Sequence, residues 1–479
     1  MNRRMIARIL SMVLIIYAAL MVLPLITGLI YGENVRGFVT AALITAAAGL
    51  LLLSFRPRTR DIFAREGFIA VGLAWVLMGL FGALPFVFSG QIPNYIDAVF
   101  ETVSGLTTTG ATILNDIEGM SRSCLFWRSF NHWIGGMGVL VFIMAVLPMS
   151  GEHSMHIMRA EVPGPTVGKL VPRARETATI LYVIYGALTV LETILLMLGG
   201  MSFFDALLHA FGTAGTGGFS TKNASIAAFD SVYIEMVIAV FLVLFGINFN
   251  LYYFVLIGRL KEALKSQELH WYLGIIAFST LFIAAGISSM YDGFATALRH
   301  SFFNTMTIIT TAGFGTEDFV HWPEYTQMLI VVLMFVGASA GSTDGGMKVS
   351  RVMLLFKSAA ADISQIFHPR MVRRVQMDGK RVDASTARAV YVFFFIYIAT
   401  ILFGTFIVSF DGNDFTTNFT ATLSCISNVG PGLSRVGPTG NYNVFSLFTK
   451  AVLSLIMLIG RLEIYPILIL FSKSMWKKK

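Results

Sequence analysis

Four short glycine-bearing segments constrain the fold of this chain more than any other feature of its sequence. Each follows an apolar stretch, and they read LTTTGAT at 106–112, GTGGFST at 215–221, TTAGFGT at 310–316 and SNVGPGL at 427–433. Aligned on one glycine, these segments place Gly110, Gly218, Gly313 and Gly430 at intervals of 108, 95 and 117 residues. A period of this length, used four times, predicts an internally repeated architecture.

The composition of these glycine segments suits the passage of a cation. A cation that leaves water needs oxygen atoms at the spacing of its lost hydration shell, and rings of backbone carbonyls can supply them. Turning carbonyls toward a shared axis requires backbone angles that glycine adopts at little steric cost. Four equivalent segments of one chain therefore predict one carbonyl-lined ring. The alternative is that they are four ordinary glycine turns between helices.

The chain is predicted to be a polytopic membrane protein. Of its 479 residues, 56% are hydrophobic and only 13% are charged, with a mean hydropathy of +0.73. A soluble protein of this size could not solvate such a surface. The net charge of +8 is therefore assigned to membrane topology rather than to a nucleic-acid partner. Cys124 and Cys425 have no metal-like spacing, so neither a disulfide framework nor a structural zinc site is predicted.

Apolar spans of roughly 20 residues are needed to cross the hydrocarbon core. Residues 5–30 and 36–55 form a leading pair of such spans, and then a unit of span, short semi-polar segment and span is used four times. The four units are 67–89, 95–107 and 125–149; 177–200, 202–213 and 231–258; 270–289, 291–309 and 322–357; and 386–410, 414–427 and 443–473. The chain divides accordingly into the leading pair at 1–60 and repeats at 61–150, 151–265, 266–365 and 366–479.

The expected fold is all-α, with ten full spans and four re-entrant pore helices. The short segments cannot cross the membrane, and non-helical backbone at that depth survives only where it lines a cavity or is packed in protein. Asp97 and Asp205 lie at equivalent places near the start of two of these segments. They are expected to cap the pore helices, with attraction of cations at the outer mouth as the alternative.

The distribution of basic residues predicts the orientation. With the N-terminus inside, 27 of the 35 lysines and arginines fall in internal segments, as the positive-inside rule requires. Both termini are then cytoplasmic, and the glycine segments face the outer half of the membrane. All four units enter and leave on the same side, so they are parallel repeats with pseudo-fourfold symmetry around an axis along the membrane normal. The pore is expected on that axis.

Two features below the glycine segments are candidates for a gate. Residues 337–348 read GASAGSTDGGMK inside an apolar span, which must break there. The resulting loop could obstruct the pore, or it could be a kink that lets helices pack closely; Asp344 within it is costly at membrane depth unless paired or hydrated. Arg461 also lies within an apolar span. It is expected to form a repulsive barrier to cations, with a structural ion pair to Glu463 or Asp344 as the alternative.

Two further groups of residues are assigned simpler roles. Small or amide residues at 246–250 and 135–138 lie inside second spans and are expected to allow close helix packing rather than to bind a ligand. Basic residues at 368–388, and in loops 56–66, 159–175 and 259–265, could dock a soluble partner. Ordinary positive-inside bias and contact with anionic membrane lipids explain the same charges, and from charge alone that explanation is preferred.

The chain resembles the Trk potassium-uptake family, in its TrkH/TrkG branch, within the wider group that includes Ktr and plant HKT transporters. The motifs that carry the resemblance are TTTGAT at 107–112, HWIGGMGVLVF at 132–142, TGGFST at 216–221, GINFNLYY at 246–253, TTAGFGT at 310–316, AGSTDGGMKV at 340–349, NVGPG at 428–432 and GRLE at 460–463. The leading pair of spans favours TrkH/TrkG over Ktr-type subunits, which lack it. The resemblance covers nearly the whole chain.

This resemblance implies a potassium-translocating subunit of the bacterial inner membrane. It implies a homodimer with one pore in each protomer, gated by a cytoplasmic nucleotide-binding subunit of the TrkA type through NAD(H) or ATP/ADP. Potassium is then the transported ion and the only metal, and any nucleotide is bound by the partner. The filter residues that it implies are Thr108, Thr109, Gly110, Thr216, Gly217, Gly218, Thr311, Ala312, Gly313, Asn428, Val429 and Gly430. The gate residues that it implies are Gly337, Gly341, Asp344, Gly345, Gly346, Lys348 and Arg461.

Two positions depart from the family pattern as we expect it. Asp344 occupies a place in the gate loop where a small neutral residue is expected, which changes the charge balance of the loop. Asn428 and Val429 replace Thr-x in the fourth segment, so a weaker selectivity than in a symmetric tetrameric channel is expected.

The sequence therefore predicts potassium uptake without covalent chemistry, and the protein is not expected to be an enzyme. A Ktr-like sodium-dependent transporter is the alternative within the same class, and symport with sodium or protons stays open. A membrane-embedded enzyme acting on lipid-linked substrates is the alternative from another class. The eight histidines are scattered, His153 and His156 lie in a loop without partners, and no HExxH or DDxxD motif is present.

Overall fold

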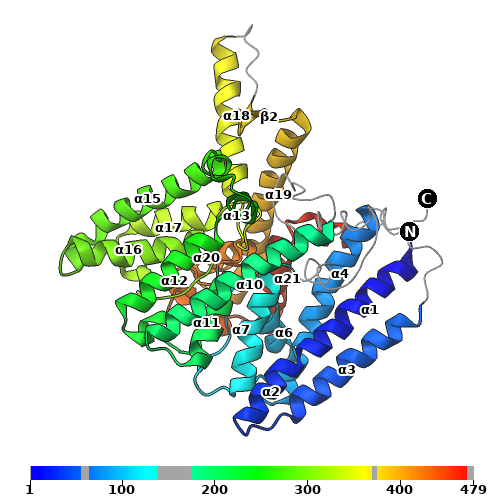
Figure 1. Ribbon diagram of the computed structural model, residues 1–479. Helices are drawn as coiled ribbons and strands as arrows, with labels where there is room; N and C mark the ends of the chain where they lie inside the picture. The colour runs from blue at the N-terminus through cyan, green and yellow to red at the C-terminus, as the bar shows by residue number, and fades with distance from the viewer. Residues whose placement is uncertain (1, 56–63, 139–173, 369–374, 472–479) are drawn as a thin grey trace.

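The computed structural model describes residues 2–55, 64–138, 174–368 and 375–471 (Figure 1). Within these ranges the chain is helical apart from one antiparallel hairpin, in which Gln376–Met377 (β1) pairs with Lys380–Arg381 (β2). The part of the predicted span 125–149 beyond residue 138, most of the predicted loops 56–66 and 159–175, and His153 and His156 lie outside the described residues.

The predicted leading pair of spans is present. It consists of α1 (Arg3–Leu20), α2 (Val22–Ile30) and α3 (Arg36–Leu53). Helix α1 packs against α3 and against α4 (Ala64–Gly82). The Tyr17 hydroxyl donates a hydrogen bond to Asn131 Oδ1 at 2.8 Å, on helix α7 (Arg122–Gly136). The leading pair is thus attached to the first repeat, and it leaves apolar side chains such as Leu43 and Leu51 exposed for contact with lipid.

Each repeat begins with a long apolar helix, followed by a short one. The long helices are α4, continued by α5 (Leu84–Phe88), then α10 (Ala174–Leu198), α15 (Gln267–Ile287) and α19 (Ala384–Val408). The short helices are α6 (Tyr95–Leu106), α11 (Phe203–Ala214), α16 (Phe294–Ile309) and α20 (Phe415–Ser427). The four short helices lie within a few residues of the predicted pore helices, and each ends where a glycine segment begins.

The expectation that Asp97 and Asp205 cap their helices is wrong. Asn94 is the N-cap of α6, and Ser202 is the N-cap of α11, each accepting hydrogen bonds from backbone N–H groups of the first turn. Asp97 and Asp205 lie three residues after these caps, where a carboxylate still complements the helix dipole. Their carboxylates bind side chains: Asp97 accepts a hydrogen bond from Lys450 Nζ at 2.8 Å, and Asp205 accepts one from the hydroxyl of its N-cap Ser202 and one from the Thr221 hydroxyl, each at 2.7 Å.

The second spans are interrupted more often than the sequence suggested. The break at 337–348 was predicted and is present between α17 (Glu324–Val336) and α18 (Val349–Phe367). The predicted continuous spans 231–258 and 443–473 are also broken, into α12 (Val232–Phe245) and α13 (Phe249–Leu256), bent by 87°, and into α21 (Leu447–Arg461) and α22 (Tyr465–Phe471). In the described part of the chain, six helices are long and apolar enough to span a membrane alone, or seven if α12 and α13 count as one. Of the ten predicted spans, one was expected to break, at 337–348; the continuity expected of 231–258 and 443–473 was wrong, because α12 ends at Phe245 and α21 ends at Arg461.

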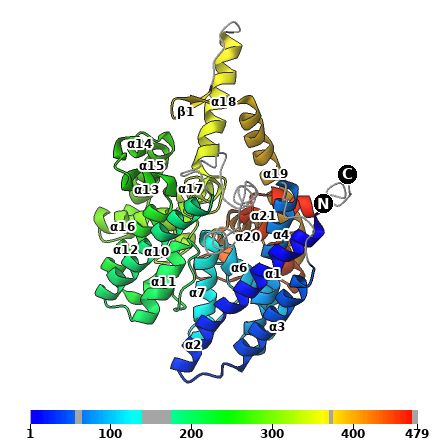
Figure 2. The same ribbon diagram turned by 45° about the vertical axis from the view of Figure 1, so that its right-hand side comes forward.

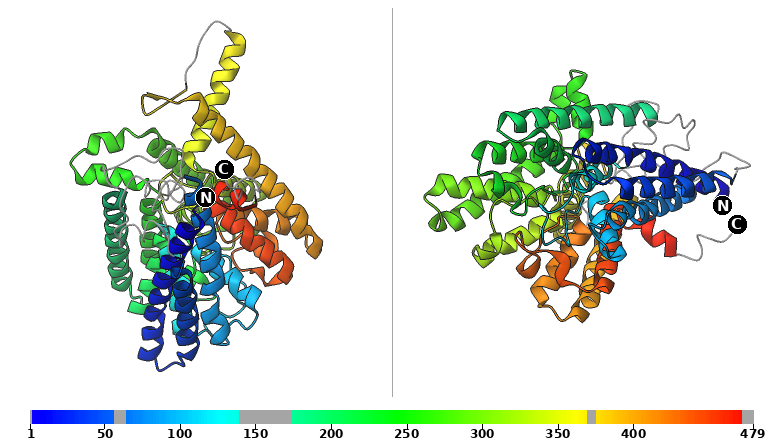
Figure 3. Two further views of the ribbon diagram at one scale, coloured as in Figure 1. Left: turned by 90° about the vertical axis from the view of Figure 1, so that its right-hand side faces the viewer. Right: turned by 90° about the horizontal axis from the view of Figure 1, so that it is seen from below.

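The pore helices and second helices close into a ring. Around it, α6 packs on α7, α7 on α11, α11 on α12, α12 on α16, α16 on α17, α17 on α20, α20 on α21, and α21 returns to α6. The view from below shows the repeats in chain order around a common centre, with the leading pair outside them (Figure 3). A closed sequence of contacts of this kind is what four parallel repeats around one axis produce.

One helical hairpin projects beyond the rest of the molecule. It is formed by the far end of α18, the β1–β2 hairpin and the start of α19 (Figures 1 and 2). Its base rests on the start of α15, where Asp378 Oδ1 accepts a hydrogen bond from the Gln267 N–H at 2.7 Å and Lys357 Nζ donates to the Gln376 carbonyl at 3.0 Å. The short helix α14 (Leu260–Leu264) lies on the same side. Single 3-10 turns occur at Ser225–Phe229, Ser288–Met290, Phe319–His321, Ser409–Asp411, Ser434–Val436 and Tyr442–Val444.

Candidate functional site: a ring of glycine segments and the loop beneath it

The four glycine segments share one unusual backbone pattern. In each, two residues separated by one other residue have positive φ: Thr108 and Gly110, Thr216 and Gly218, Thr311 and Gly313, Asn428 and Gly430. The three threonines have φ between 53° and 56°, and Asn428 has 55°. A left-handed threonine is strained by about 1–3 kcal/mol and persists only where the surroundings impose it. Four copies of the same strained pattern indicate a shared geometric requirement rather than four unrelated turns.

The four segments meet one another in order. A Cβ atom built on Gly110 would overlap the carbonyl oxygen of Gly217, and one on Gly218 would overlap that of Ala312. Likewise, Gly313 faces the carbonyl of Val429, and Gly430 faces the carbonyl of Thr109. In every case the glycine touches the carbonyl of the residue that precedes the glycine of the next repeat. The contacts run from the first repeat to the fourth and back to the first, so the twelve predicted filter residues are brought together in one closed ring.

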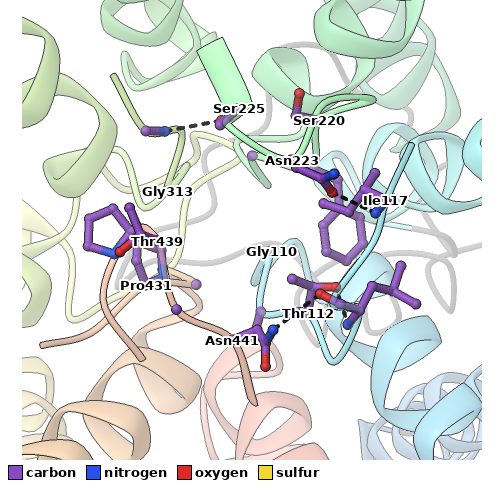
Figure 4. A pocket seen from close by; sticks show the side chains of 18 of the residues that line it. Gly110, Thr112, Ile117, Ser220, Asn223, Ser225, Gly313, Pro431, Thr439 and Asn441 are labelled. Atoms are coloured by element: carbon purple, nitrogen blue, oxygen red, sulfur yellow. Dashed lines mark hydrogen bonds between the residues drawn. The ribbon is translucent and has the colours of Figure 1, made fainter. Parts of the chain in front are cut away.

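The loops that follow the glycine segments form a second, outer ring. Each loop bonds to the next: Asn223 Oδ1 accepts from the Ile117 N–H at 2.7 Å, Ser225 Oγ accepts from the Gly315 N–H at 3.2 Å, Thr439 Oγ1 donates to Asp318 Oδ2 at 2.8 Å, and Asn441 Nδ2 donates to Asn115 Oδ1 at 2.8 Å. Figure 4 shows these loops around the mouth above Gly110 and Gly313. The cavity they surround has a volume of about 200 Å³ and is lined by all four ring glycines. This outer ring holds the four segments at fixed distances from one another.

The outer mouth carries charges of both signs: Lys222, in its lining, is paired with Glu118 at 3.3 Å, and Asp116 lies next to the lining residues Asn115 and Ile117. Asp116 accepts a hydrogen bond from Asn223 Nδ2 at 3.2 Å. This hydrogen bond lowers the pKa of the Asp116 carboxyl from its ordinary value, so the group stays ionised over the physiological range. An ionised carboxylate at the rim of a narrow mouth raises the local concentration of cations.

Asn428 is the residue that departs from the threonine pattern. Asparagine adopts the left-handed conformation more readily than threonine, and its amide supplies contacts that a threonine could not. Its Nδ2 donates to the Thr109 hydroxyl at 2.9 Å and to the Met457 carbonyl at 3.1 Å. The replacement therefore keeps the backbone geometry of the ring and adds a side-chain link between the fourth and first segments.

A buried ion pair behind the ring was not predicted as part of the site. Arg128 Nε lies 2.5 Å from Glu101 Oε1, and both side chains are almost completely buried. Arg128 also donates to the Ser220 carbonyl at 3.1 Å and lies 3.6 Å over the ring of Phe219. Glu101 accepts from the Ile113 N–H at 3.0 Å. The pair thus connects the first and second glycine segments; opposite charges in two neighbouring membrane segments were the signal that could have indicated it.

Removing one partner of this pair is expected to destabilise the protein. The variant Arg128→Gln leaves Glu101 charged and buried, at a cost of about 3–5 kcal/mol, so its denaturation midpoint in detergent should fall well below that of the wild type. The double variant Arg128→Gln with Glu101→Gln should recover part of the loss, because no uncompensated charge remains. A double variant no more stable than Arg128→Gln alone would contradict the assignment of the pair.

The 337–348 loop lies directly beneath the ring and touches several repeats. The Gly345 N–H donates to the Thr311 hydroxyl at 2.7 Å, on a glycine segment. The Gly341 carbonyl accepts from the Phe249 N–H at 3.1 Å, at the start of α13. Gly337, Gly341 and Gly346 have φ of 68°, 71° and 73°, which explains the glycines at these positions. Lys348 also has positive φ, at 76°, and its Nζ donates to the Asp344 carbonyl.

Arg461 connects the 337–348 loop to the first and fourth repeats. It ends helix α21 and is 7% exposed. Its guanidinium donates to the Thr343 carbonyl at 2.6 Å and to the carbonyls of Gly135 and Gly136 at 2.6 and 2.5 Å. The loop, the first repeat and the fourth repeat are therefore joined through one side chain.

The ion pair that the sequence offered as an alternative for Arg461 involves another residue. Glu463 is paired with Arg351, at 2.5 Å between Oε2 and Nη2. Asp344 accepts a hydrogen bond from the Ser342 hydroxyl at 2.9 Å within the loop itself. The predicted gate residues Gly337, Gly341, Asp344, Gly345, Gly346, Lys348 and Arg461 thus belong to one continuous region below the ring.

The close approach predicted for two small-residue stretches is confirmed. A Cβ on Gly135 would overlap the Leu106 carbonyl, and one on Gly136 would lie 2.7 Å from the Gly215 Cα. A Cβ on Gly246 would overlap the Tyr272 hydroxyl. Helix α7 can therefore approach the ends of two pore helices only because it carries glycine there.

Comparison with known proteins agrees with this architecture. A family model described as TrkH, cation transport protein, matches residues 33–479. The chain is 36% identical to "Trk system potassium uptake protein TrkH" of Salmonella typhimurium over 100% of both chains, and 33% identical to "Trk system potassium uptake protein TrkG" of Escherichia coli K12 over 96% of both. Its fold matches the crystal structure of the potassium transporter TrkH from Vibrio parahaemolyticus with a TM-score of 0.89, at 33% identity, over 100% of both chains.

Proposed function

The chain belongs to the TrkH family of cation transport proteins, and we propose that its ring of glycine segments is the filter through which it takes up potassium. It is a potassium uptake protein of the Trk type and a transporter, not an enzyme acting on lipid-linked substrates. The observation that carries the filter proposal is the closed order of contacts from Gly110 through Gly218 and Gly313 to Gly430. Carbonyls fixed around one axis replace the hydration shell of a cation without a cofactor.

The driving force is electrical. An inside-negative potential of 100 mV contributes about 2.3 kcal/mol for each elementary charge that crosses. The filter then needs only to distinguish ions, and the direction of transport follows from the gradient. Rubidium uptake into proteoliposomes containing the purified protein tests this function, with an inside-negative potential set without valinomycin by an inward gradient of a membrane-permeant anion such as thiocyanate. Uptake that competing potassium suppresses, and that sodium at the same concentration does not, is the expected result; uptake indifferent to both would contradict the filter.

We further propose that the 337–348 loop and Arg461 form the gate. The loop bonds to Thr311 of the filter through Gly345 and to Arg461 through Thr343. A cation leaving the filter would meet the loop and then a fixed positive charge. The loop is rich in glycine, so it can take another conformation that leaves the axis open.

The mode of coupling is a separate part of the proposal. We propose that potassium crosses the filter by uniport. The competing modes are a Ktr-like dependence on sodium and symport with sodium or protons. Ion replacement separates them: rubidium uptake that persists without sodium and at equal internal and external pH supports uniport. Uptake that requires either gradient would support the corresponding coupled mode.

The partners proposed for this chain follow from its family. The word "system" in the names of the relatives implies additional subunits for those proteins. For this chain we propose a homodimer in the bacterial inner membrane, with both termini in the cytoplasm and surrounded by membrane lipid. We also propose a TrkA-type subunit, carrying the regulatory nucleotide, that docks on the projecting α18–α19 hairpin (Figure 2). Lys380 and Arg381 form strand β2, between α18 and α19, and both are exposed.

Charge reversal tests the docking proposal. The double variant Lys380→Glu with Arg381→Glu is expected to weaken binding of the soluble subunit by about tenfold, because each exposed pair at an interface contributes modestly. Surface plasmon resonance with the transporter held in nanodiscs measures it. Lys222→Glu is the control, since this half-exposed residue lies in the outer loop network. Equal affinities for the hairpin variant and the control would exclude the hairpin as the docking site.

A further inference from the structure

One buried carboxylate contacts both ends of the 337–348 loop. Glu268 is the second residue of α15, and it is 5% exposed. Its Oε1 accepts a hydrogen bond from the Ala340 N–H at 2.7 Å and another from the Ser350 N–H at 3.1 Å. These two N–H groups lie ten residues apart in the chain, on either side of the glycine-rich part of the loop. A single oxygen atom therefore links the first third of the loop to the first turn of α18.

The position of Glu268 explains why a carboxylate is present there. Ser350 is the second residue of α18, so its N–H group has no acceptor within that helix. Glu268 also lies in the first turn of its own helix. Its negative charge thus lies at the N-termini of α15 and α18, where both helix dipoles favour an anion. Hydrogen bonds to an ionised acceptor are stronger than neutral ones.

Backbone hydrogen bonds also join the two ends of the loop to each other: the Val349 N–H donates to the Ala338 carbonyl at 2.9 Å, and the Met347 N–H donates to the Phe335 carbonyl at 3.1 Å. The loop contains three glycines with positive φ, at 337, 341 and 346, and chains rich in glycine have many accessible conformations. Arg461 and Thr311 hold the middle of the loop, at Thr343 and Gly345. Glu268 attaches the two ends of the loop to the start of α15.

The Glu268 carboxylate is structurally connected to the projecting hairpin. Glu268, Ala340 and Ser350 line a cavity of about 840 Å³, and Asp378 and Lys380 of the β1–β2 hairpin line the same cavity. The residue before Glu268, Gln267, is bonded through its N–H to Asp378. A displacement of the hairpin would therefore move the start of α15, and with it the carboxylate.

We propose that Glu268 is a positioning residue of the gate, which clamps both ends of the 337–348 loop in the closed conformation. This inference rests on the proposed role of the loop as gate and adds the residue that sets its resting state. Loss of the clamp detaches both ends of the loop from α15 while the filter stays intact, so basal flux rises and ion selectivity does not change. A carboxylate that merely attracts cations to the inner mouth would behave differently, because its removal would lower flux.

Two substitutions of Glu268 separate the effect of its side-chain length from the effect of its charge. Glu268→Asp keeps the charge but shortens the side chain by one methylene, so one oxygen cannot reach both N–H groups. Glu268→Gln keeps the length and an acceptor oxygen but removes the charge. With full-length protein in proteoliposomes and no partner subunit, Glu268→Asp is expected to raise rubidium uptake about tenfold, the equivalent of one lost hydrogen bond to a charged group. Glu268→Gln is expected to raise it less, and both should keep the wild-type preference for rubidium over sodium.

A third variant leaves Glu268 in place. Ser350→Pro removes one of the two donors at a position in the first helical turn, where proline is tolerated, and is expected to raise uptake as Glu268→Asp does. Wild-type uptake in Glu268→Asp or in Ser350→Pro would overturn the clamp. So would lower uptake in Glu268→Gln with unchanged uptake in Glu268→Asp, which is the result for a charge that attracts cations.

Arg461→Gln, measured in the same series, separates failure of the clamp from failure of the gate. If Arg461→Gln raises uptake and the Glu268 variants do not, the clamp is wrong and the gate proposal stands. If none of them raises uptake, the gate proposal fails as well. Hydrogen exchange of the peptide covering 337–350 adds a structural readout: it should be faster in Glu268→Asp than in the wild type, and equal exchange would overturn the clamp.

Discussion

Replacement of Gly313 by alanine is expected to lower the preference of this transporter for potassium over sodium by about tenfold. Gly313 has φ of 78°, and a Cβ there would overlap the Val429 carbonyl and lie 2.6 Å from Pro431 Cδ. A left-handed alanine costs roughly 1–2 kcal/mol, and 1.4 kcal/mol corresponds to a tenfold change in an equilibrium constant. The third and fourth segments must separate or rotate to admit the methyl group. The carbonyl that Gly313 faces is one of those proposed to bind the ion, so the spacing of the ring changes.

The same segment provides a matched control. Gly315 is two residues further on, its φ is not positive, and a Cβ there would meet its nearest neighbour, Pro438 Cβ, at 3.7 Å, an ordinary contact. Gly315→Ala should therefore transport like the wild type. Competition between rubidium and sodium for uptake into proteoliposomes measures both variants, with the denaturation midpoint in detergent as a check on folding. Unchanged selectivity in Gly313→Ala, at normal stability, would contradict the filter assignment.

The parts of this fold that could be predicted from sequence are those governed by local chemistry. Apolar length sets the long helices, and the glycine segments mark the ends of the pore helices. All four pore helices end within one residue of the predicted position. The break at 337–348 was also predictable, since so many glycines and small polar residues cannot continue a helix at membrane depth.

The breaks in the other second spans could not be predicted in the same way. Helix α12 ends at Phe245, before a single glycine, and α21 ends at Arg461, where Glu463 and Ile464 take positive φ. Neither sequence is a strong helix breaker. These helices stop because other repeats supply hydrogen-bond partners for the backbone groups at the helix ends. The carbonyl of Gly246, for example, accepts a hydrogen bond from the Ser339 N–H of the 337–348 loop at 3.2 Å. Such partners exist only after the repeats have assembled.

The missed features of the site have the same origin. Glu101 and Arg128 are 27 residues apart, and Glu268 is 72 and 82 residues from the groups it binds. No local sequence pattern relates positions so far apart. The sequence shows that Glu101, Arg128 and Glu268 are charged residues in apolar surroundings, but it does not show which groups they bind. By contrast, the strain at Thr108 and its equivalents had a local signature, the glycine two residues later, and the resulting ring was predictable from its fourfold repetition.

Neutralisation of Arg461 is expected to produce the largest rise in basal transport. The Arg461 side chain binds three backbone carbonyls, those of Thr343, Gly135 and Gly136. Arg461→Gln removes a positive charge from the proposed path below the filter and weakens the tether between the loop and α7. A hydrogen bond to a charged group contributes about 1.5–3 kcal/mol, so losing even one of them should raise rubidium uptake at least about tenfold.

A lysine at this position separates the two roles of Arg461. Arg461→Lys keeps the charge, but an ammonium group lacks the planar fork with which a guanidinium binds several acceptors at once. If the charge alone is the barrier, Arg461→Lys should transport at the wild-type rate while Arg461→Gln leaks. If the tether dominates, both variants should leak. Each of these results preserves a gate at Arg461, whereas wild-type uptake in Arg461→Gln would reduce this arginine to a structural link between α21, α7 and the loop.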